Sequence, residues 1–269
     1  MSQITSGIIG LTDAQKATLA DLESRENGTH PKGLKLTARM EVELAELQHK
    51  RLNPELPQGA KTYCKQWLKE YLYKRREQLK NKYVAKGHST EEDGFTSMCV
   101  QLGLGMVYKN EEFKDNGWLI GTCDLDHEAK DTVYDNKSSW TLDQFPMFET
   151  ECPNNDYLDQ VQGYMELWDR GFGSVVYTLN NLPEEMLQQQ FKPWLSDEEK
   201  QDIAINFIYT REYWDSMKSK YFPSAKDIDF VEIPEEKRVK EFKVKRNPLF
   251  IQEAKIRVEM CQKYIETLI

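Results

Sequence analysis

The chain of 269 residues holds 36 Lys and Arg against 45 Asp and Glu, a formal net charge of −9, and 39% of its residues are hydrophobic. This length and composition fit a globular protein of one large or two small domains with a full core. No apolar run approaches the ~20 residues of a membrane span, and residues 1–11 lack the basic segment that opens a signal peptide.

Helical patterns fill the first hundred residues. Four helices are expected, over residues 14–22, 36–51, 60–83 and about 90–102. Thr12 is the expected N-cap of the first helix, and Gly87 separates the third helix from the fourth. The expected apolar stripe of the third helix consists of Trp67, Leu68, Tyr71 and Leu72.

From Gly105 onward the pattern changes to short runs rich in β-forming residues. Strands are expected over residues 106–108, 118–123, 132–134 and 173–179. Asp115-Asn116-Gly117 predicts a hairpin turn between the first two strands, and a helix over 156–169 precedes the last one.

The remaining chain is mostly helical by its pattern. Ser196 and Glu199 predict the start of a helix that runs to about residue 221. Residues 223–247 are expected to form a loop with at most one short strand, and a helix follows over 250–268. We expect one α/β domain over residues 1–269, with a helical lobe over 1–85, a core over 86–225 and a helical tail over 226–269.

The cysteine pattern bears on compartment and metal content. The five cysteines are odd in number and form no Cys-x-x-Cys pair. This favours reduced thiols in a cytosolic compartment and argues against a structural zinc or iron–sulfur site.

Two carboxylates and a lysine stand at the ends of the expected strands. Asp124 follows the run 118–123 and Asp135 follows 132–134, so neighbouring strands can bring these carboxylates together. Lys137 shares the face of Asp135 because side chains alternate along a strand. Carboxylates, with the backbone carbonyl of Asn136 as an extra oxygen ligand, suit Mg²⁺. The metal ion and the lysine then provide what phosphodiester hydrolysis needs, an activated water and charge stabilisation.

Each of these elements alone is weak evidence. A lone Asp-x-Lys occurs in many strands, Asp126 competes with Asp124, and Gln160 and Tyr164 are also compatible with an ordinary pair one helical turn apart. The order as a whole is more specific: carboxylate, turn, Asp-x-Lys, loop, Gln-x-x-x-Tyr helix and strand.

With these residues in order, residues 86–180 resemble the PD-(D/E)XK nuclease superfamily, in its RecB-like and phage lambda-exonuclease-like branch. The resemblance implies a restriction-endonuclease-like core, a small mixed central sheet flanked by helices, with helical additions at both ends of the chain. It implies that Asp124 is the first metal-binding Asp and that Asp135 and Lys137 form the (Asp/Glu)-x-Lys element. Gln160 and Tyr164 then match the Gln-x-x-x-Tyr helix motif, completing the catalytic set.

The upstream acid and the cofactor also follow from the resemblance. Gly87 to Glu91 resembles the Gly-x-x-x-Glu start of the preceding helix, which implies Glu91 as a further catalytic and metal-binding residue, with Glu92 and Asp93 as alternatives. The implied cofactor is Mg²⁺, with Mn²⁺ as a substitute. The iron–sulfur cluster of some relatives is not expected, because the cysteines are not clustered.

The function implied is that of a DNA exonuclease acting on duplex ends in phage-type recombination or repair. The implied setting is the cytosol of a bacterium or a phage-infected host, with a single-strand annealing protein and a homo-oligomer as partners and no membrane. The same residues would serve an endonuclease of restriction, CRISPR-adaptation or flap type. A non-catalytic nucleic-acid-binding module is the alternative of another class, and the complete acid–acid–lysine set argues against it.

Basic residues cluster in two segments despite the acidic total, and nucleic-acid binding depends on such local charge. The segments lie within residues 69–86 and 237–246. The residues of the first segment expected to contact nucleic acid are Arg75, Arg76, Lys80, Lys82 and Lys86. A solvated surface is the alternative interpretation of either segment.

Overall fold

The computed structural model describes residues 11–76 and 82–269 of the chain. The chain divides into two compact units, one of residues 1–76 with 248–269 and the other of residues 77–247. These boundaries differ from the expected ones at residues 85 and 226, because the last helix packs with the first segment of the chain. In the described residues, no helix combines the length and the apolar character that crossing a bilayer requires.

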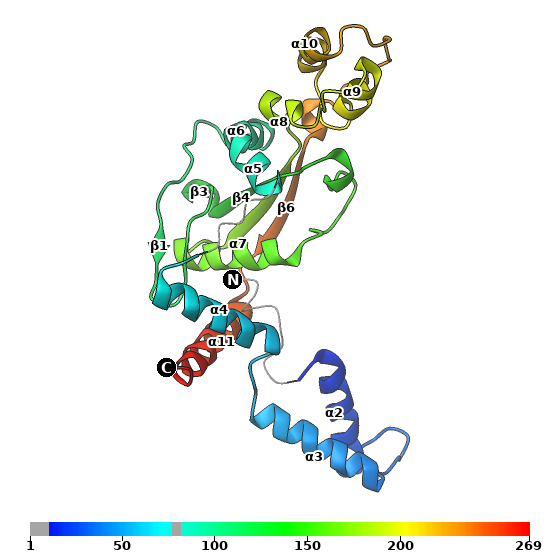
Figure 1. The fold of residues 1–269 in the computed structure, drawn as a ribbon. Helices are drawn as coiled ribbons and strands as arrows, with labels where there is room; N and C mark the ends of the chain where they lie inside the picture. Colours follow the sequence, from blue (N-terminus) through cyan, green and yellow to red (C-terminus); the bar gives the residue numbers. More distant parts are fainter. Residues whose placement is uncertain (1–10, 77–81) are drawn as a thin grey trace. The chain divides into compact units, whose positions relative to one another are not determined.

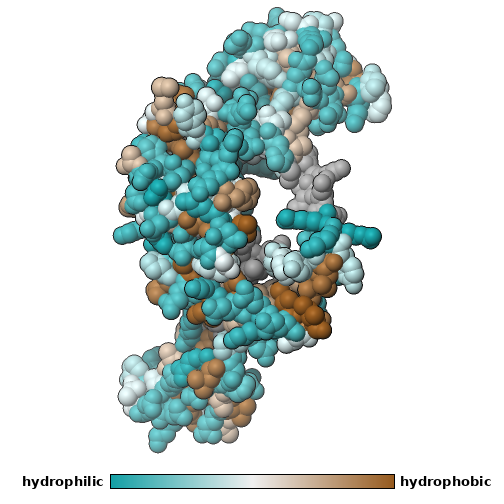
Figure 2. All heavy atoms as spheres, turned by 90° about the vertical axis from the view of Figure 1, so that its left-hand side faces the viewer, coloured by the Kyte–Doolittle hydropathy of each residue, from teal (hydrophilic) through white to brown (hydrophobic). Residues whose placement is uncertain are grey.

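Polar residues dominate the surface, as expected for a chain with 30% charged residues. Figure 2 shows one face of the molecule, on which hydrophilic residues cover most of the area and hydrophobic residues lie in separate patches.

The first unit begins with a helix pair, α2 (Asp13–Glu26) and α3 (Ala38–Leu52). Thr12 caps α2 as predicted, since its Oγ1 accepts the Gln15 N–H at 3.0 Å and its own N–H donates to Gln15 Oε1 at 3.0 Å. The buried cluster between the two helices consists of leucines, Leu11, Leu19, Leu22, Leu44 and Leu47. Their helical spacing gives each helix one apolar stripe, which the pair buries.

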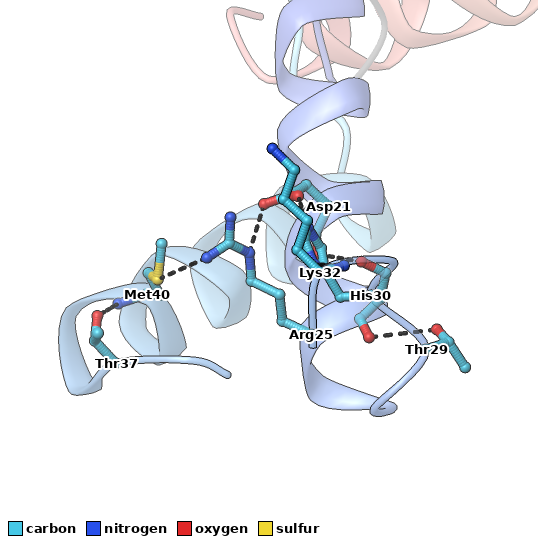
Figure 3. A network of polar contacts seen from close by, with 8 residues as sticks. Asp21, Arg25, Thr29, His30, Lys32, Thr37 and Met40 are labelled. Atoms are coloured by element: carbon cyan, nitrogen blue, oxygen red, sulfur yellow. Dashed lines mark hydrogen bonds and ion pairs between the residues drawn. The ribbon is translucent and has the colours of Figure 1, made fainter. Parts of the chain in front are cut away.

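A polar network ties the loop after α2 back to that helix (Figure 3). The Asp21 carboxylate accepts a hydrogen bond from Arg25 Nε at 2.7 Å and lies 3.1 Å from Nε2 of His30. Arg25 also reaches α3, where its Nη1 lies 3.9 Å from Sδ of Met40. These contacts fix the turn that reverses the chain between the two helices.

The second helix pair of this unit is α4 (Gln58–Tyr73) with α11 (Pro248–Glu266). Its buried cluster joins Leu56, Ala60, Cys64 and Cys261. The helix expected over residues 60–83 is shorter in the structure, because α4 ends at Tyr73 and Lys74 adopts a left-handed backbone with φ 52°.

The apolar stripe expected on α4 is wrong for three of its four members. Leu68 is buried, but Trp67, Tyr71 and Leu72 are 41%, 57% and 50% exposed. The buried face consists of Ala60, Cys64 and Leu68 at a spacing of four residues, so α4 directs its aromatic rings to solvent.

A four-stranded mixed sheet forms the centre of the second unit, in the order β3-β4-β5-β6 (Figure 1). β3 (Leu125–His127) runs antiparallel to β4 (Thr132–Ser138), and β4 runs parallel to β5 (Phe172–Thr178). β6 (Val239–Lys245) completes the sheet antiparallel to β5. This mixed sheet flanked by helices confirms the predicted fold class. β6 lies in the segment 223–247, for which one short strand is allowed by the sequence, so the tail expected to be helical over 226–269 contains this strand before its helix.

The second unit also contains helices and 3-10 turns. The helices are α5 (Lys82–Ser89), α6 (Glu91–Gln101), α7 (Asn155–Trp168), α8 (Glu184–Gln188), α9 (Asp197–Ala204) and α10 (Arg211–Tyr221). Three 3-10 turns span Glu128–Lys130, Leu142–Gln144 and Glu235–Lys237. The single helix expected over 195–221 is thus two helices, and its predicted start is confirmed by the capping box of Ser196 and Glu199.

The predicted hairpin turn is confirmed with shorter strands. β1 (Lys114–Asp115) pairs antiparallel with β2 (Ile120–Gly121), and the Asn116 N–H donates to the Leu119 carbonyl at 3.1 Å. The described residues 106–108, where the first strand of the hairpin is expected, form no strand. The first strand is β1 instead, which directly precedes the turn.

The two faces of β4 contact different helices, and successive side chains of the strand point to opposite faces as predicted. Val133 belongs to a buried cluster with Val161 and Met165 of α7. Tyr134 belongs to another cluster, with Met98 of α6. Because alternate residues share a face, β4 directs Asp135 to the α7 side.

Gly173 of β5 allows α7 to lie close to the sheet. A Cβ at this position would lie 2.1 Å from Val161 Cγ1 and 3.2 Å from Met165 Sδ. Because these side chains are buried, we expect Gly173→Ala to lower the free energy of unfolding by about 1–3 kcal/mol, measured by urea denaturation. The added change Val161→Ala removes the close atom and should recover part of the loss. If Gly173→Ala has the wild-type free energy of unfolding, α7 can move away from the sheet without loss of stability, and the prediction is wrong.

Candidate active site

Backbone pairing brings Asp124 beside the end of β4. The Asp124 N–H donates to the Tyr134 carbonyl at 3.1 Å, and its Oδ2 accepts the Asn136 N–H at 2.6 Å. The N–H and C=O of one strand residue point the same way, so the Asn136 carbonyl is directed toward the Asp124 side as well. Asp124, Asp135 and this carbonyl therefore supply oxygen atoms at one end of the sheet.

Both carboxylates have raised pKa values. Burial and the charge of Asp135 raise the pKa of Asp124 to about 6, against the Asn136 N–H and the charges of Lys137 and Lys109. Burial also raises the pKa of Asp135, against the ion pair with Lys137. Two desolvated carboxylates whose pKa values stay raised despite the nearby Lys137 favour a bound cation and are typical of functional sites.

The ammonium group of Lys137 contacts its own strand and helix α7. Lys137 Nζ lies 2.6 Å from Asp135 Oδ2 on β4 and donates to Gln160 Oε1 on α7 at 3.1 Å. Gln160 Nε2 in turn donates to the Tyr164 hydroxyl at 2.6 Å, and burial raises the pKa of Tyr164, which keeps this hydroxyl protonated. The strand and the helix thus join four of the predicted residues in one chain of contacts, Asp135, Lys137, Gln160 and Tyr164.

Glu91 is the first residue of α6 and has other partners. Its carboxylate pairs with Lys109 and lies 3.8 Å from Nδ1 of His88. Glu92 and Asp93 are exposed. In the described ranges, no three His, Cys, Asp or Glu side chains gather closely enough to hold a metal ion, so the structure does not join Glu91 to Asp124 and Asp135.

Asp126, the competitor of Asp124, has a separate partner. Arg170 donates to its two carboxylate oxygens at 2.7 and 2.8 Å. This bidentate pair satisfies both oxygens with a fixed cation, which favours Asp124 as the acid available for a metal ion.

Sequence reasoning missed three residues at this site. The Asn110 N–H donates to the Asp124 carbonyl at 2.8 Å, and its Nδ2 donates to the Cys123 carbonyl at 3.0 Å. Lys109 pairs with Glu91, and the Tyr157 ring centroid lies 4.7 Å from Lys137 Nζ. Tyr157 lies three residues before Gln160, a spacing that places both on one helix face and was the available signal.

The donor set fits a divalent cation of the hard type. Mg²⁺ takes oxygen ligands and usually binds to one or two carboxylates, with water and phosphate oxygens completing its shell. Asp124 and Asp135 would be the protein carboxylates, with the Asn136 carbonyl as a further ligand. Burial is the largest cause of their raised pKa values, and a bound cation would favour the ionised form of both carboxylates.

Lys86 requires a correction, because it is not a surface residue. It is 1% exposed, and its Nζ donates to the carbonyls of Ser139 at 2.7 Å and Trp140 at 3.0 Å. A buried ammonium group cannot contact a phosphate. Arg75 and Arg76 are exposed, whereas Lys80 and the side chain of Lys82 lie outside the described residues.

Lys86 should matter for stability instead. Lys86→Met leaves two buried carbonyls without their donor, so we expect a loss of about 1–3 kcal/mol in the free energy of unfolding, measured with urea at neutral pH. Burial lowers the pKa of Lys86 from 10.5 to about 8.

The lowered pKa gives this prediction a pH signature. Between pH 8 and 10.5 the unfolded chain retains the proton that the folded chain loses at Lys86. The contribution of Lys86 to stability therefore rises with pH in this window. The difference in stability between wild type and Lys86→Met should grow over the same range, and parallel pH profiles would contradict this account.

The fold is that of an α/β protein in which two carboxylates, a lysine and a Gln–Tyr helix pair lie beside a small mixed sheet. The chain is similar in structure to a phage-related exonuclease from Haemophilus somnus 129PT, with 25% identity and a TM-score of 0.60 over 79% of this chain and 83% of that one. No family model and no curated protein matches the sequence.

More distant structures are those of an alkaline exonuclease, LHK-Exo. The enzyme from Laribacter hongkongensis is 12% identical with a TM-score of 0.47, over 78% of this chain and 81% of that one. LHK-Exo in complex with dAMP is 13% identical with a TM-score of 0.50, over 78% and 82%. The latter likeness concerns the fold alone.

Proposed function

We propose that the chain is a metal-dependent DNA exonuclease of the PD-(D/E)XK superfamily that hydrolyses phosphodiester bonds from duplex ends. The observation that carries the proposal is the contact of Lys137 with Asp135 at 2.6 Å and with Gln160 at 3.1 Å, beside Asp124. This arrangement stands on a fold that resembles a phage-related exonuclease at 25% identity. A role in phage-type recombination or repair is part of the proposal.

The residues divide the chemistry among themselves. Asp124 and Asp135 would hold the metal ion, which when bound supplies Lewis-acid activation of the phosphodiester and of water. Lys137 places a positive charge where negative charge develops in the transition state. Asp135 and Gln160 fix the position of that ammonium group, and Tyr164 fixes Gln160. Glu91 remains a proposed further metal ligand, which would have to leave its pairing with Lys109.

Cleavage of two DNA forms tests the proposal. End-labelled linear duplex and covalently closed circular DNA are incubated with the protein, in Mg²⁺, in Mn²⁺ and in EDTA. We expect shortening of the linear DNA alone, supported by both metal ions and abolished by EDTA. Cleavage of the circle would contradict the exonuclease proposal and favour an endonuclease. Inactivity on duplex, single-stranded DNA and RNA would favour a non-catalytic binding module.

The proposed exonuclease function also leads us to propose two kinds of partner. A single-strand annealing protein would accompany an exonuclease of recombination, and a homo-oligomer would retain the DNA during repeated cleavage. Sedimentation of the protein alone and with a candidate annealing protein tests both proposals.

A further inference from the structure

Among the implied metal ligands, Glu91 stands apart, and Lys109 is the residue that contacts it. The Lys109 ammonium group donates to Glu91 Oε1 in an ion pair, and the other carboxylate oxygen, Oε2, lies 3.8 Å from His88 Nδ1. Each oxygen of this carboxylate thus faces a basic side chain. Glu91 has to give up one of these contacts before that oxygen can bind a metal ion.

The backbone places Lys109 beside Asp124. The next residue, Asn110, donates its N–H to the Asp124 carbonyl at 2.8 Å. Its side-chain Nδ2 donates to the Cys123 carbonyl at 3.0 Å and to Thr122 Oγ1 at 3.2 Å. These bonds hold the backbone next to Lys109 in place, whereas a lysine carries its ammonium group on a flexible four-carbon stem. The ammonium group can therefore move while the backbone beside it stays fixed.

The charge of Lys109 acts on two of the implied metal ligands. It pairs with Glu91 directly. Burial is the largest cause of the raised pKa of Asp124, and the charge of Lys109 is among the effects that oppose this rise. The ammonium group thus balances part of the negative charge that a divalent cation would balance. A lysine and a cation compete in such a place, because each supplies positive charge to the same carboxylates.

The ion pair of Lys109 with Glu91 is held less firmly than the neighbouring pair of Lys137 with Asp135. Lys137 Nζ also donates to Gln160 Oε1 at 3.1 Å, which fixes its position. Within the described residues, the Lys109 ammonium group has Glu91 as its one hydrogen-bond partner. A single ion pair between two long, flexible side chains is weak, so a divalent cation can displace the lysine from Glu91.

We propose that Lys109 is a positioning residue of the metal site. Its ammonium group holds Glu91 as a counter-ion while no divalent cation is bound, and it releases this carboxylate when a cation binds. The inference rests on the proposed metal-dependent function and deepens it, because it makes Lys109 a residue that sets the affinity for the metal ion. Glu91 then joins Asp124 and Asp135 only in the metal-bound protein.

Titration of the full chain with Mn²⁺ in a calorimeter, without DNA, tests the proposal. Lys109→Met keeps the side chain's length but frees Glu91, so we expect Mn²⁺ to bind about fivefold more tightly than to wild type. Lys109→Arg retains the charge and should bind Mn²⁺ within about twofold of wild type. Glu91→Gln loses a charged ligand and should bind Mn²⁺ about tenfold more weakly.

The double variant Glu91→Gln/Lys109→Met separates the proposed role from a general effect of charge. If Lys109 acts through Glu91, loss of the lysine should change the Mn²⁺ affinity by less than about twofold once Glu91 is replaced. The same gain in affinity in both backgrounds would mean that Lys109 acts on the cation by its charge alone, and it would overturn the proposal. Equal Mn²⁺ affinity of wild type and Lys109→Met would overturn it as well.

A matched ion pair in the same unit provides the control. Lys220 of α10 pairs with Glu184 of α8, so Lys220→Met removes a paired lysine elsewhere and should leave the Mn²⁺ affinity unchanged. Circular dichroism checks that each variant folds. A wild type that binds no Mn²⁺ would contradict the proposed metal dependence and this inference together, whereas Mn²⁺ binding that does not respond to Lys109→Met would contradict this inference alone.

Discussion

Lys137→Met is expected to reduce the rate of DNA hydrolysis by about 10²–10³-fold. The side chain keeps its length but loses the ammonium group that contacts Asp135 at 2.6 Å and Gln160 at 3.1 Å. In the proposed mechanism this charge stabilises the negative charge that develops in the transition state. Single-turnover cleavage of end-labelled linear duplex in Mg²⁺ at saturating protein measures the loss in the chemical step.

The control for this prediction lies on the same sheet. Lys243 of β6 has a side chain 74% exposed and an ion pair with Glu241 at 3.4 Å, so Lys243→Met removes a lysine without touching the site and should leave the rate unchanged. Circular dichroism checks that both variants fold. Wild-type cleavage by Lys137→Met would remove Lys137 from the mechanism and leave its contacts as structural.

Asp124→Asn is expected to abolish the stabilisation of the protein by a divalent cation. For wild type, Mn²⁺ at about 100 times its dissociation constant should add about 2.7 kcal/mol to the free energy of unfolding. The variant loses one of the two carboxylates, so its melting temperature should not respond. Asp143 is exposed, and Asp143→Asn is the matched control that should retain the wild-type response.

The raised pKa of Asp124 also predicts a pH dependence without metal. A carboxyl group with a folded pKa of about 6 instead of 3.8 binds more protons in the folded than in the unfolded chain between these values. Its contribution to stability is present below pH 3.8 and is lost as pH rises through about 6.

Metal-free Asp124→Asn should therefore be more stable than wild type at neutral pH, by about 3 kcal/mol. Urea denaturation in EDTA across this range measures the difference. A difference in stability between wild type and Asp124→Asn that is the same at pH 5 and at pH 7 would contradict the role given to Asp124. A rise in the melting temperature of the variant on addition of Mn²⁺ would contradict it as well.

Much of the site could be predicted from local rules of the chain. The alternation of side chains along a strand placed Asp135 and Lys137 on one face, and the helical period placed Gln160 and Tyr164 together. Each of these rules concerns residues of a single strand or a single helix, so it holds however that element packs in the fold. The ion pair of Lys137 and the hydrogen bond of Gln160 with Tyr164 are their direct results.

Features that depend on tertiary contact could not be read in this way. Lys86 looks like one member of a basic surface run, and only the carbonyls of Ser139 and Trp140 show that it is buried. Trp67 and Tyr71 lie beside the apolar face of α4, and whether they are covered depends on the partner helix. β6 lies in a charged segment, and it forms a strand because it pairs with β5, which is distant in the sequence.

The site between Asp124 and Asp135 is tested most directly by a crystal structure of the protein grown with Mn²⁺ and measured at the manganese absorption edge. We predict an anomalous peak within coordination distance of both carboxylates, with the Asn136 carbonyl among its ligands. The same crystals of Asp124→Asn should lose this peak. A metal ion bound elsewhere, with Asp124 and Asp135 free of it, would contradict the account of this protein as a metal-dependent nuclease.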